Sequence, residues 1–184
     1  MWPLLFCVVH RPCVAVPRYV GVMRINRSSG TPATVALEHA GVAHTVHAYE
    51  HNPRAESFGL EAAAALDVDP HRVFKTLLVD TGDGLAVGVV PVTGSLDVKA
   101  LALALGVKKV AMAAPASAER SSGMVVGGIS PIGQKRPLPT VLDSTMQQHG
   151  TVLVSGGRRG LDVELSPCDL AHLTNATFAQ ISRP

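Results

Sequence analysis

The first of two features of this 184-residue sequence that could take part in chemistry is a lysine inside an apolar segment. Lys75 lies within the run 73–79, where a strand would place its ammonium group on the same face as Val73 and Leu77. If that face is interior, the ammonium group needs a ligand, a carboxylate or a cavity. A lysine at the solvent-facing edge of a sheet would explain the same pattern without any function.

The second feature is the segment 127–133, which reads Gly-Gly-Ile-Ser-Pro-Ile-Gly. Glycine lets the main chain approach a small ligand closely, so several N–H groups could meet an oxyanion or a carboxyl group. A tight connection between two strands is the alternative. A nucleotide-binding P-loop does not fit, because Gln134 separates the last glycine from Lys135 and two prolines prevent a following helix.

The other reactive side chains form no recognisable centre. His44, His47 and His51 are close in sequence, but on a strand His44 would face away from the other two. Zinc would also need a further carboxylate or thiolate nearby. Cys168 has no base close in sequence, and Ser155 is not part of a G-x-S-x-G elbow. We therefore expect no metal, no cofactor and no nucleophile supplied by the protein.

Composition and charge limit the classes of function. With 47% apolar residues the chain can bury a sizeable core, and the composition favours α/β. The net charge is only +2, and after residue 30 acidic residues outnumber basic ones, which excludes a protein that coats nucleic acid by charge alone. Any RNA contact must be local. The basic doublets at 108–109, 135–136 and 158–159 could supply it, although solvated surface charge explains each equally well.

Residues 1–30 stand apart from the rest. The apolar run 2–9 is too short to span a bilayer, and arginines follow it instead of preceding it as in a secretory signal. We expect a disordered extension or a misassigned start, with Met23 as the alternative start, before a single domain over 31–184. Three unevenly spaced cysteines without CxxC spacing argue against a disulfide framework and indicate the cytoplasm.

Caps and alternation predict the elements that must position these residues. Helices are expected over 32–40, 60–66, 97–105 and 115–120, and from Ser166-Pro167 onward, with a helical turn at Asp69-Pro70. Strands are expected over 45–49, 73–80, 85–92, 107–112, 139–143, 151–155 and 161–165, with a hairpin turn at 81–84. Because strands outnumber helices and hairpins mix with crossovers, the fold class is α/β of the α+β type, a mixed, barrel-like sheet with peripheral helices.

Four motifs together resemble the YbaK/EbsC family of free-standing aminoacyl-tRNA deacylases. They are Tyr49-Glu50-His51-Asn52-Pro53, the run 73–79, the segment 127–135 and Ser155-Gly156-Gly157-Arg158-Arg159-Gly160-Leu161-Asp162. Their order and spacing extend the resemblance over residues 31–181, and the sequence is most similar to the branch that acts on Cys-tRNA(Pro). The resemblance implies the fold of the editing domain inserted in bacterial prolyl-tRNA synthetases.

The resemblance also implies a mechanism. In that branch the thiol of the misplaced cysteine attacks its own ester carbonyl, releasing tRNA and a cyclic thiolactone that then opens to cysteine. A protein without a nucleophile is then expected. Its contribution would be to hold thiol and ester together and to stabilise the developing charge.

Individual roles follow from the motif match. Lys75 would be the essential polar residue at the ester or the terminal adenosine, while Gly127, Gly128 and Ser130 would form the loop that meets the developing oxyanion. Asp162 would pair with the ammonium group of the substrate. The residues implied to bind substrate are Tyr49, Phe58, Thr76, Ser155 and Asp162.

Two alternatives stay open. A deacylase of the same fold could act on alanine or serine instead of cysteine, and a catalytically silent module could simply hold tRNA or a synthetase. Because no RNA-recognition domain follows the motifs, tRNA identity could be read by a partner such as prolyl-tRNA synthetase. The choice of cysteine rests on the resemblance alone.

Overall fold

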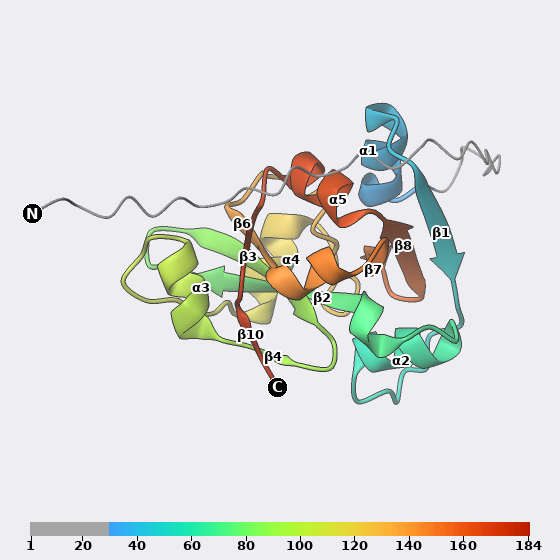
Figure 1. Ribbon diagram of the computed structural model, residues 1–184, viewed down its shortest axis with the longest axis horizontal. Helices are drawn as coiled ribbons and strands as arrows, with labels where there is room; N and C mark the ends of the chain where they lie inside the picture. Colours follow the sequence, from blue (N-terminus) through green and yellow to red (C-terminus); the bar gives the residue numbers. More distant parts are fainter. Residues whose placement is uncertain (1–29) are drawn as a thin grey trace, which may run out of the picture.

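The computed structural model describes residues 30–184, in which a mixed sheet is surrounded by helices (Figure 1). The extension expected over residues 1–30 lies, except for Gly30, outside the described residues. Neighbours across the main sheet are, in order, β1 (His44–Ala48), β8 (Leu161–Leu165), β7 (Val152–Arg158), β2 (Val73–Asp80), β3 (Leu85–Pro91), β6 (Thr140–Asp143) and β9 (Thr177–Ala179). A short strand, β5 (Ala111–Met112), pairs with the end of β2, and β4 (Ser95–Leu96) pairs with β10 (Ser182–Arg183).

The pairing is both parallel and antiparallel. Strands β2 and β3 form the antiparallel hairpin expected from the turn at 81–84. Long connections instead make β7 parallel to β2 and β6 parallel to β3. Strand β8 then pairs antiparallel with both β7 and β1. The predicted mixed sheet with peripheral helices is therefore confirmed, and β2 lies in its interior.

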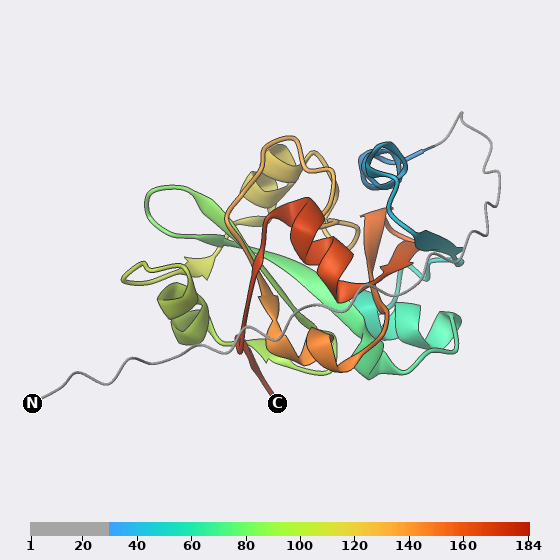
Figure 2. The same ribbon diagram turned by 45° about the horizontal axis from the view of Figure 1, so that its top comes forward.

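Five helices cover this sheet in the described part of the chain, and most begin at the residues expected to cap them. They are α1 (Pro32–Ala40), α2 (Phe58–Ala65), α3 (Val98–Ala104), α4 (Pro115–Ser122) and α5 (Pro167–Thr174), with two 3-10 turns, η1 (Pro70–Arg72) and η2 (Ser144–Gln148). The side chains of Thr31, Asp97 and Ser166 accept hydrogen bonds from the first-turn N–H groups of α1, α3 and α5. Figures 1 and 2 both place α2 and α3 at opposite ends of the sheet.

Several elements differ from expectation. Helix α2 begins at Phe58 instead of Leu60, because Ser57 caps it. The strand expected over 107–112 is wrong in extent, since only Ala111 and Met112 find a partner at the end of β2. The short elements β4, β9, β10 and η2 were not expected, because two to five residues are too few to show a period.

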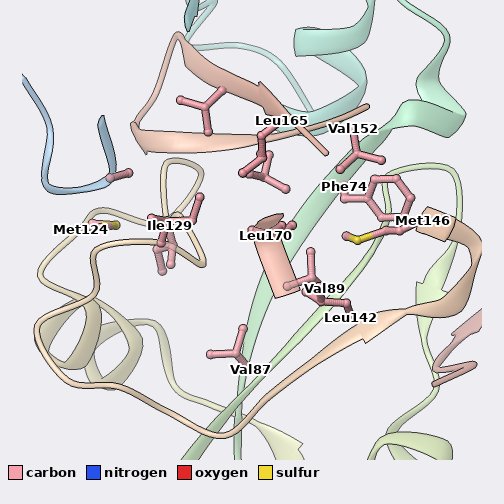
Figure 3. Close-up of a cluster of buried hydrophobic side chains, with 14 of the residues drawn as sticks. Phe74, Val87, Val89, Met124, Ile129, Leu142, Met146, Val152, Leu165 and Leu170 are labelled. Atoms are coloured by element: carbon pink, nitrogen blue, oxygen red, sulfur yellow. The ribbon is translucent and has the colours of Figure 1, made fainter. Parts of the chain in front are cut away.

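The main core lies between the sheet, α1, α4 and α5. Leu170 of α5 lies at its centre, close to Val89 and Leu142 (Figure 3). Ile129 of the glycine-rich segment packs in the same cluster, so that segment is anchored by an apolar side chain. A smaller cluster on the other side of β2 and β7 joins Val73 and Leu153 to Ala62 and Ala63 of α2. No helix among residues 30–184 is long and apolar enough to cross a membrane.

Candidate active site

Along four neighbouring strands, β1, β8, β7 and β2, the side chains alternate between the face of the main core and the face of the candidate site. One row of opposed residues consists of Val46, Val163, Val154 and Phe74, and all four pack in or against the main core. Successive side chains point to opposite faces of a sheet. The next row therefore faces away from that core, toward the side covered by α2, and it consists of His47, Asp162, Ser155 and, one residue after Phe74, Lys75.

Lys75 is a partly buried lysine on an interior strand, so the alternative of a solvent-facing edge lysine is wrong. Its Nζ donates a hydrogen bond to the carbonyl oxygen of Gly94, at 2.6 Å. Burial lowers the pKa of Lys75, and no carboxylate of the described residues forms an ion pair with it. An ammonium group has three donors, so two remain for a ligand.

Gly94 can be only glycine in this arrangement. A Cβ built on it would lie 2.7 Å from the carbonyl oxygen of Arg183 in β10. The end of the chain thus packs behind the turn that orients Lys75, a connection that no sequence motif indicated.

Asp162 is the most deeply buried acidic group on this face, with 5% of its surface exposed. Burial raises the pKa of Asp162 to about 6, although the nearby His47 lowers it. Among the described residues no cation forms an ion pair with its carboxylate. A buried carboxylate without a cation is costly unless a ligand supplies the charge.

Two hydroxyl groups near this row have no hydrogen-bond partner within the described part. They are Oγ of Ser155, directly opposite Asp162, and Oγ1 of Thr76, next to Lys75. Thr76 shares its face of β2 with Phe74 and Leu78, so it points toward the main core and not toward the face of Lys75. Buried polar groups without partners are rare and mark places where a ligand or water can bind, which on the face of Lys75 applies to Ser155.

Tyr49 and Phe58 border the same region. Tyr49 follows β1, and its N–H donates to the carbonyl oxygen of Gly160, at 3.0 Å. Burial, together with the negative charges of Asp162 and Glu61, raises the pKa of Tyr49 to about 12. The Tyr49 hydroxyl therefore stays protonated and can donate a hydrogen bond at neutral pH.

Phe58 begins α2 and packs directly on the glycine-rich segment. A Cβ built on Gly127, whose φ is +85°, would lie 2.9 Å from the Phe58 ring. The guanidinium group of Arg159 lies over the same ring, 5.0 Å from its centroid. Its Nε also donates to the carbonyl oxygen of Val126, at 2.9 Å. Phe58 and Arg159 thus hold the start of the glycine segment from two sides.

The amides of the glycine segment are not equally available. Gly128 donates its N–H to the carbonyl oxygen of Val125, at 2.9 Å, whereas no hydrogen bond within residues 30–184 uses the N–H of Gly127. Gly128 is nevertheless required as glycine, since a Cβ there would lie 2.6 Å from the main chain of Arg158. Of the two glycines, Gly127 is therefore the one whose N–H has no partner within the described residues.

Ser130 lies inside the glycine segment, and its polar groups bond to residues in or beside that segment. It is fully buried, its N–H donates to Sδ of Met124, and its Oγ accepts from the N–H of Ile132, at 3.1 Å. Its carbonyl oxygen accepts from Gln134. These bonds shape the segment, and a catalytic role of Ser130 stays a prediction.

Known proteins match this chain in sequence and in fold. Residues 53–173 match the sequence profile of the aminoacyl-tRNA editing domain. The chain belongs to this family. It is 42% identical over 121 residues to EbsC of Enterococcus faecalis (strain ATCC 700802 / V583), which is named as a Cys-tRNA(Pro)/Cys-tRNA(Cys) deacylase; the match covers 65% of this chain and 74% of EbsC.

Solved structures agree with this assignment. A trans-editing enzyme for prolyl-tRNA synthetase and the hypothetical protein APE2540 each superpose with a TM-score of 0.74 and 25% identity. Each match covers 83% of this chain, with 96% of the first structure and 99% of the second. The resemblance to the YbaK/EbsC family and the fold expected from it are confirmed.

The three histidines considered as a possible metal site, His44, His47 and His51, have separate partners. His44 Nδ1 contacts the carbonyl oxygen of Val42, His47 Nε2 contacts Glu164, and His51 Nδ1 contacts Glu61. In the described part of the editing domain no three His, Cys, Asp or Glu side chains are grouped as metal ligands would be. Sequence reasoning missed what His47 does. The one available signal was its alternation with Val46, which places it opposite Asp162 once β1 and β8 are paired.

Proposed function

We propose that this editing domain is a trans-editing deacylase that removes cysteine from Cys-tRNA(Pro), and also acts on Cys-tRNA(Cys). The observation that carries the proposal is one sheet face with a buried, unpaired Asp162 and with Lys75, which has spare donors. A carboxylate suits the ammonium group of an aminoacyl ester, and an ammonium group suits its oxygens. The names of EbsC and of the trans-editing enzyme support this substrate class.

In this proposal the substrate supplies its own nucleophile. Asp162 binds the substrate ammonium group, Lys75 donates to an ester or ribose oxygen, and the N–H of Gly127 donates to the developing oxyanion. The thiol sulfur bonds to the carbonyl carbon, the bond from that carbon to the ribose oxygen breaks, and the thiol proton passes to the released hydroxyl. Water then opens the thiolactone to cysteine. Ser155 and Tyr49 complete the pocket with their hydroxyl groups.

The acceptor end of the tRNA would approach over the glycine segment. Two basic doublets border that segment, since Gly128 touches the main chain of Arg158, and Gly123, which precedes the segment, packs on the side chain of Lys135. Arg158, Arg159, Lys135 and Arg136 are all exposed. Exposed cations at this position can hold the phosphates of the acceptor end. We propose prolyl-tRNA synthetase as the partner that reads tRNA identity, and the cytoplasm as the place of action.

A panel of mischarged tRNAs tests the substrate and the mechanism together. Cys-tRNA(Pro) should lose its amino acid far faster than Ala-tRNA(Pro) or Ser-tRNA(Pro), and prolyl-tRNA synthetase should raise the rate. S-methylcysteinyl-tRNA(Pro) should resist cleavage, because the methylated sulfur cannot form the thiolactone. Rapid hydrolysis of the methylated substrate would instead show that water attacks directly. Binding of tRNA without cleavage of any substrate would favour a silent module.

A further inference from the structure

A second polar cluster extends the site along the same face of the sheet. Glu164 lies two residues after Asp162 on β8, so both side chains point to this face. One carboxylate oxygen of Glu164 accepts hydrogen bonds from Arg72 Nη2 and Thr151 Oγ1, both at 2.5 Å. Its other oxygen lies 2.8 Å from Nε2 of His47. Arg72 also donates to Thr151 Oγ1, at 2.6 Å, which closes the cluster.

This cluster is largely shielded from solvent. The side chains of His47 and Glu164 expose 25% and 22% of their surface. Burial would raise the pKa of Glu164, but hydrogen bonds from Thr151, His47 and Arg72 outweigh it and keep the pKa below its ordinary value. Glu164 is therefore a fixed anion, and His47 has one defined acceptor for its ring. Partly buried charges of this kind are screened less by salt than surface pairs are.

His47 links the cluster to Asp162. The two residues are directly opposite each other on β1 and β8, and opposed residues of an antiparallel pair have Cβ atoms about 5 Å apart. No hydrogen bond joins them within the described residues, so any effect of His47 on Asp162 is electrostatic: a protonated imidazole here lowers the pKa of Asp162. Besides Asp162, the charged or titratable groups on or bordering this face are His47, Tyr49, Glu164, Lys75, Arg72 and, from α2, Glu61 with its partner His51.

We propose that His47 is a positioning residue of the active site: Glu164 and Arg72 hold its imidazole beside Asp162, where its positive charge keeps the Asp162 carboxylate ready for the substrate ammonium group. The inference rests on the proposed function in one respect, the role of Asp162 as the ammonium site. Asp162, a buried carboxylate without an ion pair among the described residues, lies directly opposite His47 on β1. His47 itself touches no reacting atom in this scheme.

The test compares His47→Gln with His44→Gln. Glutamine at 47 can still donate a hydrogen bond to Glu164 but carries no charge. The variant therefore separates the effect of the charge of His47 from the effect of its hydrogen bond. His44 lies on the same strand and contacts only the carbonyl oxygen of Val42, which makes it the matched control. Both variants are assayed for kcat/KM of Cys-tRNA(Pro) deacylation from about pH 5 to about pH 8.5, because that ratio reports ionisations of the free enzyme.

In His47→Gln the acidic limb of the profile should move to higher pH. The value of kcat/KM should fall about three- to tenfold near pH 6 and return to within about twofold of the wild type at pH 8.5, where Asp162 is ionised without help. His44→Gln should follow the wild-type curve. A profile of His47→Gln that superposes on the wild type, or one that is lowered equally at every pH, would overturn the proposal.

Two further measurements separate this inference from the proposed function. In an Asp162→Asn background, His47→Gln should cause no additional loss, whereas independent losses from the two substitutions would contradict action through Asp162. The carboxyl carbon of Asp162 can also be titrated by NMR in the substrate-free protein. Its midpoint should rise in His47→Gln and not in His44→Gln, whatever substrate the enzyme proves to cleave. An unchanged midpoint refutes the inference, while failure to deacylate any aminoacyl-tRNA refutes only the proposed function.

Discussion

Lys75 and Asp162 both lie in surroundings that disfavour their charges. Burial lowers the pKa of the lysine and raises the pKa of the aspartate to about 6, yet neither side chain forms an ion pair within residues 30–184. In a protein selected for stability alone, two such groups on one face would be paired or replaced. In the proposed function, their separation keeps both available to a substrate that carries an ammonium group beside an ester.

Substitution of Lys75 tests the site most directly. Lys75→Ala should lower the single-turnover rate of Cys-tRNA(Pro) deacylation at least about 100-fold, which is typical for loss of a donor to a developing charge. Lys99→Ala, an exposed lysine of α3, should keep the wild-type rate. Wild-type activity in Lys75→Ala would remove Lys75 from the mechanism.

Asp162→Asn should strongly reduce deacylation but leave a measurable residual rate, and it should stabilise the protein. The pKa of Asp162 is about 6 in the folded protein against about 4 in the unfolded chain, so the unfolded state loses its proton first as the pH rises. The contribution of this group to the free energy of unfolding is therefore lost as the pH rises from about 4 to about 6. Replacement by asparagine should restore on the order of 2 kcal/mol of that free energy at pH 7.

Urea unfolding of this variant and of the wild type at pH 7 and at pH 4 measures the direction of this change in unfolding free energy. The gain should shrink to a few tenths of a kcal/mol at pH 4, where the folded wild type is protonated and the unfolded chain is about half protonated. Asp83→Asn, in the exposed turn before β3, serves as the control and should leave stability unchanged. A loss of stability at pH 7 in Asp162→Asn would mean that the carboxylate has a partner in the folded protein.

Among the elements, the glycine segment depends on close main-chain packing. It lies between the first residue of α2 and the turn that joins β7 to β8, and Gly128 has no room for a side chain against Arg158. The apolar contacts of Ile129 in the main core and the hydrogen bonds of Ser130 anchor the segment. An element built in this way can present the N–H of Gly127 in one fixed direction.

Gly128→Ala should disturb this geometry. The new Cβ would lie 2.6 Å from main-chain atoms of Arg158 and Arg159, so one of the two segments must move. We expect a loss of about 1–3 kcal/mol in unfolding free energy and a fall of about 10- to 100-fold in kcat, because small displacements of catalytic groups are costly.

Gly150→Ala is the matched control for this substitution. A Cβ added at Gly150 would meet no atom within 4 Å, and the φ of this residue is not positive. The variant should therefore retain activity and stability. Equal effects of the two alanine substitutions on deacylation kinetics and on urea midpoints would contradict the packing argument.

At the scale of the whole molecule, the modest net charge leaves RNA binding to local patches. Two of the three basic doublets border the glycine segment, whereas Lys108 and Lys109 are exposed just before β5. The doublets thus provide an internal comparison between cations near the site and cations elsewhere.

Replacement of Lys135 and Arg136 by alanine should weaken tRNA binding and lower its salt dependence. If the two side chains contact two phosphates, the slope of log K against log salt should decrease by about 1 to 2. The same double replacement at Lys108 and Lys109 should change the slope much less. Titration of tRNA(Pro) by fluorescence anisotropy at several salt concentrations measures both, and equal slopes in the two variants would exclude a specific path over the glycine segment.

Local patterns in the sequence determined much of the fold. The caps at Thr31, Asp97 and Ser166 and the strand over 73–80 are specified by neighbouring residues, because capping and alternation act over a few positions. The lysine within an apolar run and the glycine segment were visible for the same reason. The family could be identified from the motifs that contain them.

Only the tertiary structure decided how these parts meet. The parallel pairing of β7 with β2 places Ser155 on the strand next to Lys75, with Asp162 one strand further along the same face. It joins residues about 80 positions apart that no local period connects. Gly94 behind Lys75, His47 opposite Asp162 and the internal hydrogen bonds of Ser130 all depend on that pairing or on loop packing. A residue's type shows what chemistry it can do, but its burial and its partners, which decide whether it does so, arise from contacts between segments far apart in the chain.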